Sequence, residues 1–522
     1  MKIVTRTFVA SALAVAVVCV AAQSVSSAPK KPAAAASPSA SASASPAPLP
    51  TATPEPPQTA IPRLEAKIKA DPNDKASLQE LAGYYLETGK AQQALSLTQR
   101  LLALGPKSAQ VYYLDGVAQQ NVGKIKEATD DFEQASNLEP TNAQVLLTLT
   151  ELYLRTNRAS DAERVAKRAT TFNPTDKRVF ENYGLVLEQE GKYDDARTQF
   201  EAAAKLDAKD PEPVVFEARS YLAQKSYALA SSDFDRALQI DPKNTDSLLG
   251  KARLLATSHN VKDSIATYET LLGIVPNDQA KAAVLVEEYT VYRDEKMNDQ
   301  ALATLKRAVA AYPSVPAVHL AYGDYYATIG KDNRAAETEW KTALGPNRDV
   351  PDALSRLGQL ALQQRKNRDA VGYFKRLTEV APGDPNAWFT LGQVYNANAQ
   401  FQDARGAYAH SFGLQQTPQA LAGLGAADLA LKNYKECTRV FQAINKGALD
   451  LMKANPTLFY AYGKCAEGNN DKVLARAAYT QFKPYVKPGT QLDADVNRAL
   501  KRLGGSSKQV SPRPKSSAAP HR

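Results

Sequence analysis

The chain has 522 residues, 44% of them hydrophobic, and a formal net charge of +9. Its three cysteines are too few for a disulfide-dense or zinc-ribbon framework, and its four histidines are scattered without metal-ligand spacing. Residues 1–22 carry +2, residues 23–60 carry +1 and residues 504–522 carry +4, which leaves only +2 for residues 61–503. Because the central region is nearly neutral, the charge does not indicate a nucleic-acid-binding protein.

Residues 1–22 have the organisation of a signal peptide. Lys2 and Arg6 form a positive start, an apolar run covers residues 8–22, and the small residues 20–22 form a cleavage site before Gln23. We therefore expect an exported protein that is periplasmic or attached to the cell surface.

Two alternatives to this cleavage are weaker. Ser26-Ser27-Ala28 is a second cleavage site, but Pro29 next to the cut disfavours it. The apolar run is also short for a helix that spans a membrane, which favours cleavage over a permanent anchor.

Residues 23–60 form an Ala/Ser/Pro-rich linker. The stretch from Pro29 to Ala60 contains nine prolines and lacks the apolar residues needed for a core. We expect it to be disordered and to act as an extended spacer. Helical periodicity begins at Ile61, and residues 62–70 are predicted to form one helix before the first full repeat.

A 34-residue period runs through the central region. Small residues recur at this interval, at the position where two helices approach closely, in Ala94, Ala128, Ala162, Ala196 and Ala230. Prolines that end the second helix of a repeat follow the same frame, at Pro72, Pro106, Pro140, Pro174, Pro242 and Pro276. Glycines recur at the close-contact position of the first helix, in Gly116, Gly184, Gly323, Gly358, Gly392, Gly425 and Gly463. A generic helical bundle would not keep one register for this long.

The stretch from Trp388 to Tyr408 contains the full pattern of one repeat. It reads W-F-T-L-G-Q-V-Y, then A-N-A-Q-F-Q-D-A, then R-G-A-Y. This resembles the tetratricopeptide repeat, in which W-x2-L-G-x2-Y is followed by A-x3-F and then Pro. The resemblance implies an all-α protein, a right-handed α-solenoid (superhelix) built from about twelve helix-turn-helix repeats.

The repeats and their end can be placed from this register. Residues 492–503 form an amphipathic helix, expected to cap the array, and residues 504–522 form a disordered basic tail. Insertions near Gln279 and near residues 447–453 are expected to fall between helices. The repeats are placed at 75–108, 109–142, 143–176, 177–210, 211–244, 245–278, 282–315, 316–348, 351–384, 385–417, 418–455 and 456–489.

Nothing in the chain indicates an enzyme. It contains no phosphate-binding loop, no nucleophile elbow and no C-x-x-C pair, and the repeats leave no room for a catalytic domain. Carboxylate runs such as Asp130-Asp131 and Glu287-Glu288 are interpreted as solvated helix faces. We therefore expect no cofactor, no metal site and no nucleic-acid partner.

The resemblance implies that positions two, five, six, nine, twelve and thirteen of the first helix of each repeat line a concave groove. Arginines at these positions suggest a basic track that holds carboxylates or other anions, with ion pairing to neighbouring Glu and Asp as the alternative interpretation. The chaperone-type carboxylate clamp of lysines and asparagines is not reproduced. The candidate groove residues are Arg219, Arg253, Arg293, Arg356, Asn182, Phe389, Gln393 and Asn396.

Loss of the signal peptide leaves two cysteines, Cys437 and Cys465, in adjacent repeats. A disulfide needs Cα atoms about 4.4–6.8 Å apart, which neighbouring repeats allow, and an oxidising compartment permits the bond. The alternative is a pair of buried free thiols.

Two functions agree with these features. The first is a non-enzymatic scaffold in the bacterial envelope that binds a protein or peptide partner segment in the concave groove. The second is an accessory protein for polysaccharide export or glycan binding, for which Tyr113, Phe216, Phe389 and Tyr460 are the candidate aromatic residues. The basic tail adds peripheral contact with the envelope as an option, against a simple solvated tail. The fold cannot choose between the two functions.

Overall fold

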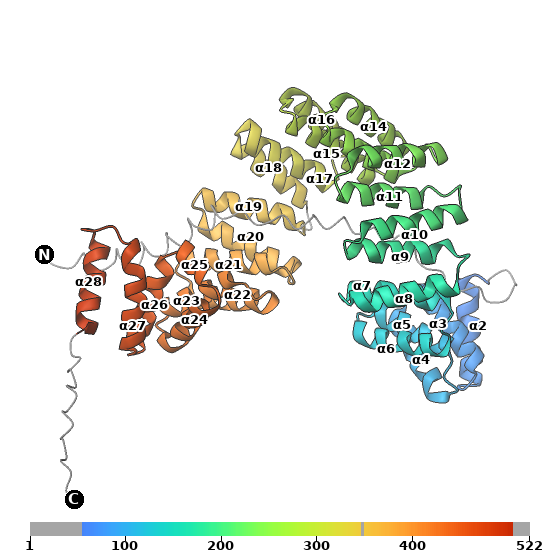
Figure 1. Cartoon of the computed structure of the whole chain (residues 1–522), viewed down its shortest axis with the longest axis horizontal. Helices are drawn as coiled ribbons and strands as arrows, with labels where there is room; N and C mark the ends of the chain where they lie inside the picture. The colour runs from blue at the N-terminus through green and yellow to red at the C-terminus, as the bar shows by residue number, and fades with distance from the viewer. Residues whose placement is uncertain (1–54, 346–348, 505–522) are drawn as a thin grey trace, which may run out of the picture. The chain divides into compact units, whose positions relative to one another are not determined.

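The protein is described here by a computed structural model that covers residues 55–345 and 349–504. The predicted signal peptide, most of the predicted linker and residues 505–522 of the predicted basic tail lie outside these described residues. All regular structure within them is helical, and each helix packs mainly on its neighbours in sequence (Figure 1). The contacts divide the chain into two compact units, and the division falls between Ala301 and Leu302, inside one helix.

The N-terminal unit contains α2 to α15 and the start of α16. Its helices are α2 (Pro57–Ala70), α3 (Lys75–Glu87), α4 (Ala91–Leu104), α5 (Ala109–Asn121), α6 (Ile125–Leu138), α7 (Ala143–Arg155), α8 (Ala159–Phe172), α9 (Lys177–Gln189), α10 (Tyr193–Leu206), α11 (Glu212–Ala223), α12 (Tyr227–Ile240), α13 (Thr245–Thr257), α14 (Val261–Ile274), α15 (Asp278–Asp294) and α16 (Asn298–Ala311).

The C-terminal unit contains the rest of α16 and all later helices. These are α17 (Pro316–Tyr325), the π-helical turn η2 (Tyr326–Gly330), α18 (Asn333–Leu344), α19 (Pro351–Gln363), α20 (Asn367–Val380), α21 (Pro385–Ala397), α22 (Phe401–Leu414), α23 (Pro418–Ala430), α24 (Tyr434–Gly447), α25 (Leu449–Ala454), α26 (Thr457–Gly468), α27 (Lys472–Phe482), the 3-10 turn η3 (Lys483–Tyr485) and α28 (Gln491–Gly504).

Twelve helix pairs, from α3/α4 to α26/α27, follow one another between α2 and α28. In this article the first helix of each pair is called helix A and the second helix B. The predicted all-α solenoid of about twelve repeats is confirmed. The alanines at the 34-residue spacing of helix B, such as Ala94 and Ala128, are fully buried.

In seven of the twelve repeats a glycine of helix A lies against a large ring of helix B. A Cβ atom added to Gly184 would lie 2.3 Å from the ring of Phe200, and one added to Gly392 would lie 2.7 Å from the ring of Tyr408. The rings of Phe200 and Tyr408 are buried, so the glycines allow the two helices to approach closely around them. The glycine pattern in the sequence therefore has a packing cause.

The turn between helix A and helix B requires one residue in the left-handed region. In the first six repeats this residue recurs every 34 positions, in Gly89, Gly123, Asn157, Gly191, Lys225 and His259. Glycine adopts this conformation without a steric penalty, and asparagine is the most tolerant of the others. Lysine and histidine therefore carry a local cost here that the packing of the helices outweighs.

Three expectations about element boundaries need correction. Helix α2 begins at Pro57 instead of residue 62, because its first turn is stabilised by Ala60, which is fully buried. The insertion near Gln279 lies inside α15, which has 17 residues where most helices A have 13. The insertion near residues 447–453 forms the short helix α25, whose Met452 is fully buried.

Two carboxylate runs are also not the solvated faces that were expected. Glu288 is only 3% exposed. Asp131 lies at a polar cluster in the second repeat, where the Gln119 amide donates to the carboxylates of Asp115, at 2.5 Å, and Asp131, at 2.7 Å. Burial, followed by the nearby Asp115, raises the pKa of Asp131 to about 7. This burial could not be read from the sequence, because it depends on how neighbouring helices pack.

Candidate functional site

The four predicted groove arginines all form ion pairs with carboxylates in the structure. Arg219 lies 3.3 Å from Asp246, and Arg253 lies 2.5 Å from Glu287; each pair joins the helix A of one repeat to that of the next. In the other two pairs Arg293 contacts Asp294 at 2.8 Å and Arg356 holds Asp324 through two bonds of 2.5 and 2.8 Å. The hydrogen bonds to Glu287 and Asp324 raise the pKa of Arg253 and Arg356.

These pairs change the character of the predicted basic track. Each guanidinium forms an ion pair with a carboxylate of the same or an adjacent repeat, so its positive charge is compensated inside the protein. The alternative interpretation of the arginines, pairing with neighbouring Glu and Asp, matches these contacts. Arg219, Arg253 and Arg293 belong to the N-terminal unit, whereas Arg356 belongs to the C-terminal unit, so the four are not one continuous site within either unit.

The remaining predicted groove residues lie in two places. Asn182 is on α9, and its side-chain oxygen is buried without a hydrogen-bond donor among the described residues. Phe389, Gln393 and Asn396 are together on α21. The ring of Phe389 packs against Tyr408 with centroids 5.7 Å apart, and Asn396 is buried. Of these four residues, only Asn182 presents a buried acceptor that lacks a donor.

The aromatic residues expected for glycan binding each contact another aromatic ring, within one repeat or, for Phe216, across to the preceding repeat. Tyr113 contacts Phe132, Phe216 contacts Phe200, Phe389 contacts Tyr408 and Tyr460 contacts Tyr479, with ring centroids 5.2 to 5.8 Å apart in every case. A sugar-binding platform requires an exposed ring face. Tyr460 is buried, and the other three rings are partly buried in contacts between neighbouring helices.

A cluster of acidic residues occupies the groove positions of α9, α11 and α13. Glu181 and Glu188 hold positions five and twelve of the repeat that begins at residue 177. Glu212, the first residue of α11, holds position two of the repeat that begins at residue 211, and Asp246 holds position two of the repeat that begins at residue 245. Arg219 is the basic residue among them, paired with Asp246. We call Glu181, Glu188, Glu212 and Asp246 with Asn182 the acidic face.

Burial raises the pKa of three carboxyl groups of the acidic face. Burial raises the pKa of Glu181 to about 7, with Asp210 and Glu212 adding to the rise and Lys177 opposing it. Burial also raises the pKa of Glu188 to about 7, although Ser220, Arg219 and Arg197 partly oppose it. The pKa of Glu212 is raised by burial and by Asp246.

The acidic face also contains two hydrogen-bond acceptors that have no donor within the described ranges. One side-chain oxygen of Glu181 and that of Asn182 are buried and have no donor among the described residues. A buried acceptor without a donor costs about 1–3 kcal/mol, so a partner that supplies N–H groups would recover this energy.

Sequence reasoning missed these carboxylates although the signal was present. Glu181, Glu188, Glu212 and Asp246 stand at the same groove positions that singled out the arginines. Examining both signs of charge at those positions would have found them. Their burial, which raises the pKa values, could not be read from the sequence.

Two further searches of the described residues gave negative results. No cluster of His, Cys, Asp and Glu side chains within them is arranged to hold a metal ion. None of the helices in the described ranges combines the length and the apolar character required to span a membrane.

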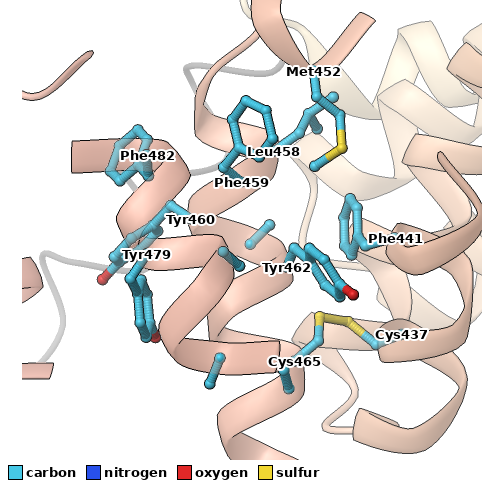
Figure 2. Packing of buried hydrophobic residues seen from close by; sticks show 14 of the residues in the cluster. Cys437, Phe441, Met452, Leu458, Phe459, Tyr460, Tyr462, Cys465, Tyr479 and Phe482 are labelled. Atoms are coloured by element: carbon cyan, nitrogen blue, oxygen red, sulfur yellow. A yellow bond between two sulfur atoms is a disulfide. The ribbon is translucent and has the colours of Figure 1, made fainter. Parts of the chain in front are cut away.

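The two predicted cysteines lie side by side in the C-terminal unit. Cys437 on α24 and Cys465 on α26 are joined as a disulfide, with Cα atoms 5.6 Å apart, and both are fully buried (Figure 2). They lie in an apolar cluster that includes Phe441, Met452 and Tyr462. The bond therefore links two successive repeats within this core.

Comparison with known proteins assigns the family. Models of the tetratricopeptide repeat match residues 122–181, 178–210, 221–285, 292–351 and 355–411, which together are more than half of the chain. The chain belongs to the tetratricopeptide repeat family.

Individual relatives match only parts of the chain. The type IV pilus assembly protein PilF of Pseudomonas aeruginosa is 28% identical over 186 residues, which are 35% of this chain and 73% of PilF. The photosystem I assembly protein Ycf3 of a Synechococcus strain is 32% identical over 110 residues, 19% of this chain and 64% of Ycf3. Among solved structures, YrrB, a repeat protein with an unusual peptide-binding site, is 23% identical, with a TM-score of 0.31 over 35% of this chain and 95% of YrrB.

Proposed function

We propose that this chain is an exported, non-enzymatic scaffold of the bacterial envelope that binds a basic segment of a partner protein on the acidic face. Tetratricopeptide repeat proteins mediate protein–protein interaction, and the relatives PilF and Ycf3 are assembly proteins by name. The observation that carries the proposal is the excess of carboxylates at the groove positions of α9, α11 and α13, together with two buried acceptors that lack donors.

A lysine or arginine side chain supplies what the acidic face lacks. Its N–H groups would satisfy the acceptors of Glu181 and Asn182, and its charge would return the carboxylates to their ionised forms. This partner has the opposite charge to the acidic ligand expected from the arginines. The aromatic side chains that a polysaccharide site would use are engaged in ring contacts between neighbouring helices, so the acidic face supports a protein partner better.

Fluorescence polarisation with labelled ten-residue peptides tests the partner chemistry. We expect a lysine-rich peptide to bind the full chain and a glutamate-rich peptide of the same length not to bind. The variant E181Q/E188Q should weaken binding by roughly tenfold or more, because it removes two interacting charges. The matched control E127Q/D195N, which removes two exposed charges from helices B, should bind like the unchanged protein.

The same assay has a pH signature. Since the pKa values of Glu181 and Glu188 are about 7, both groups release protons when a cation binds. Binding should strengthen between pH 6 and pH 8, by up to about tenfold for each carboxylate. Equal binding by E181Q/E188Q, or by a neutral peptide, would contradict a basic partner.

Export is the second element of the proposal, and it rests on the composition of residues 1–22. N-terminal sequencing of the protein from its native cell should find Gln23 as the first residue, in a fraction outside the cytoplasm. An intact Met1 in the cytoplasmic fraction would contradict export without affecting the assignment of the acidic face.

A further inference from the structure

A pocket of about 180 Å³ lies between α6, α7 and α8, away from the acidic face. Three guanidinium groups meet there, all contributed by the loop before α8 and by α8 itself. The pocket is lined by Glu133, Ser136, Asn137, Leu149, Tyr153, Arg158, Arg164, Val165 and Arg168.

Two of the three guanidinium groups have internal carboxylate partners. Arg158 lies 3.3 Å from Glu133 and 2.8 Å from Asp161, and Arg164 lies 3.0 Å from the same Asp161. The hydroxyl of Tyr153 also donates to Glu133 at 2.7 Å. The carboxylates of Glu133 and Asp161 are therefore both already bound by side chains of the protein.

Arg168 is the third guanidinium, and it has no carboxylate within ion-pair distance among the described residues. Its Nη2 donates to the hydroxyl of Ser136, while its Nε is buried without an acceptor in the same residues. Burial lowers the pKa of Arg168, and the charge of Arg164 lowers it further. A buried donor without an acceptor carries a desolvation cost, so this pocket lacks an acceptor.

The repeat symmetry of the chain shows what is missing. Arg236 stands 68 residues, or two periods, after Arg168. It lies 2.6 Å from Glu217 and 3.4 Å from Asp233, two carboxylates that are almost fully buried.

The residues two periods before Glu217 and Asp233 are Leu149 and Val165, and both line the pocket. The repeat that contains Arg168 thus keeps the guanidinium but has apolar side chains where the other repeat has its two counter-charges. The pocket opens at the place of the missing carboxylates.

We propose that this pocket binds a carboxylate group from outside the chain. The positive charges of Arg158, Arg164 and Arg168 exceed the negative charges of Glu133 and Asp161 by one, which matches a singly charged carboxylate better than a doubly charged phosphate. Leu149 and Val165, both almost fully buried, provide an apolar wall for the carbon atoms next to the carboxylate.

Saturation-transfer NMR with the full chain at constant ionic strength and pH 7 tests the site, with millimolar N-acetylglycine as the probe. We expect a saturation signal from N-acetylglycine and none from N-acetylglycinamide, which has the same shape without the charge. Inorganic phosphate at equal concentration should not displace the probe. Displacement by phosphate, or an equal signal from the amide, would overturn the assignment to a carboxylate.

Two variants locate the signal at the pocket. R168Q should reduce the saturation signal at least fivefold without lowering the melting temperature, because it removes a charge that has no internal partner. The control R155Q changes an exposed arginine of the same repeat that does not line the pocket, and it should leave the signal unchanged. An unchanged signal in R168Q would overturn the proposal.

V165D gives the pocket the carboxylate that Asp233 supplies to Arg236. It should abolish probe binding, because the new carboxylate pairs with Arg168. A V165D protein that melts like the unchanged protein and still gives the full signal would contradict the inference. If V165D does not fold, R168Q and its control still decide the question.

Discussion

The fourth repeat, which begins with α9, and the last repeat, which begins with α26, differ at groove position five and in the surroundings of groove position twelve. Position five is Glu181 in α9 and Tyr460 in α26, and position twelve is glutamate in both, as Glu188 and Glu467. Tyr460 is buried against Tyr479 and Phe482. Position five of α9 instead holds a carboxyl group, Glu181, whose pKa burial raises to about 7.

The glutamates at position twelve show the difference most directly. Glu467 accepts a hydrogen bond of 3.0 Å from the hydroxyl of Tyr479 and forms an ion pair with Arg502 of the terminal helix α28. Glu188 forms no ion pair among the described residues, and its pKa is raised. In the last repeat Glu467 is held by Tyr479 and by Arg502 of α28, whereas Glu181 and Glu188 of the fourth repeat form no ion pair among the described residues. The comparison teaches that one repeat frame can either pair the glutamate at position twelve inside the protein or leave it without an ion pair, depending on the residues around it.

Breaking the disulfide should change the free energy of unfolding more than any other change proposed here. Removing a cross-link that closes a loop of this length costs about 3 kcal/mol, so C437S/C465S should lower the free energy of unfolding of the C-terminal unit by roughly that amount. Both tryptophans of the chain, Trp340 and Trp388, are in the C-terminal unit, so their fluorescence during urea unfolding reports on it.

The control for this experiment is the unchanged protein in reducing buffer, which should unfold like C437S/C465S. The part of the circular dichroism transition that belongs to the N-terminal unit should not move. Identical tryptophan transitions with and without reductant would mean that the disulfide contributes nothing to the last repeats.

The pH dependence of stability should give an intermediate effect, confined to the N-terminal unit. The folded-state pKa values of Glu181 and Glu188, about 7, lie above the unfolded value of about 4.3, so the folded state holds more protons between these values. Stability should therefore be highest near pH 4.5 and should fall as the pH rises through 7, by about 1–2 kcal/mol in total after solvent screening.

Urea unfolding followed by circular dichroism at pH 5 and pH 8 measures this loss. E181Q/E188Q should reduce it, and the slope that remains should come from Asp131, Glu212, Glu217 and Asp233, whose pKa values burial raises in the same direction. The tryptophan signal of the C-terminal unit is the internal control. A stability that rises from pH 5 to pH 8 in the N-terminal unit would show that the sign is wrong.

Substitutions in the turns between helix A and helix B should change the free energy of unfolding least. This change should not depend on the residues of the groove. Gly191 follows α9 with φ of 78°, and Ala399 follows α21 with φ of 56°. Since a Cβ atom is unfavourable in this conformation, A399G should stabilise the C-terminal unit by about 1 kcal/mol, and G191A should destabilise the N-terminal unit by a similar amount. The tryptophan transition measures the first change and circular dichroism measures the second. Shifts of the same sign in both variants would contradict this account.

The sequence by itself determined the fold, because the contacts that define a repeat are local. Gly184 meets Phe200 only 16 residues later, and the left-handed residues recur after each helix A, so a 34-residue frame contains all the information for one repeat. For the same reason the twelve repeats could be counted before the structure was known, and the pairing of Cys437 with Cys465 could be named as one of two alternatives.

Only the tertiary structure decided which charges at the groove positions are paired inside the protein and which are buried without an ion pair. Arg253 is neutralised by Glu287 one repeat later, and Glu181 is buried beside residues of the following repeat. The sequence positions of these residues were known, but their burial and pairing depend on how neighbouring repeats pack against each other. Desolvation depends on every atom that covers a group, so the pKa of a side chain and the charge of a surface follow from the packed array and cannot be read from the repeat pattern alone.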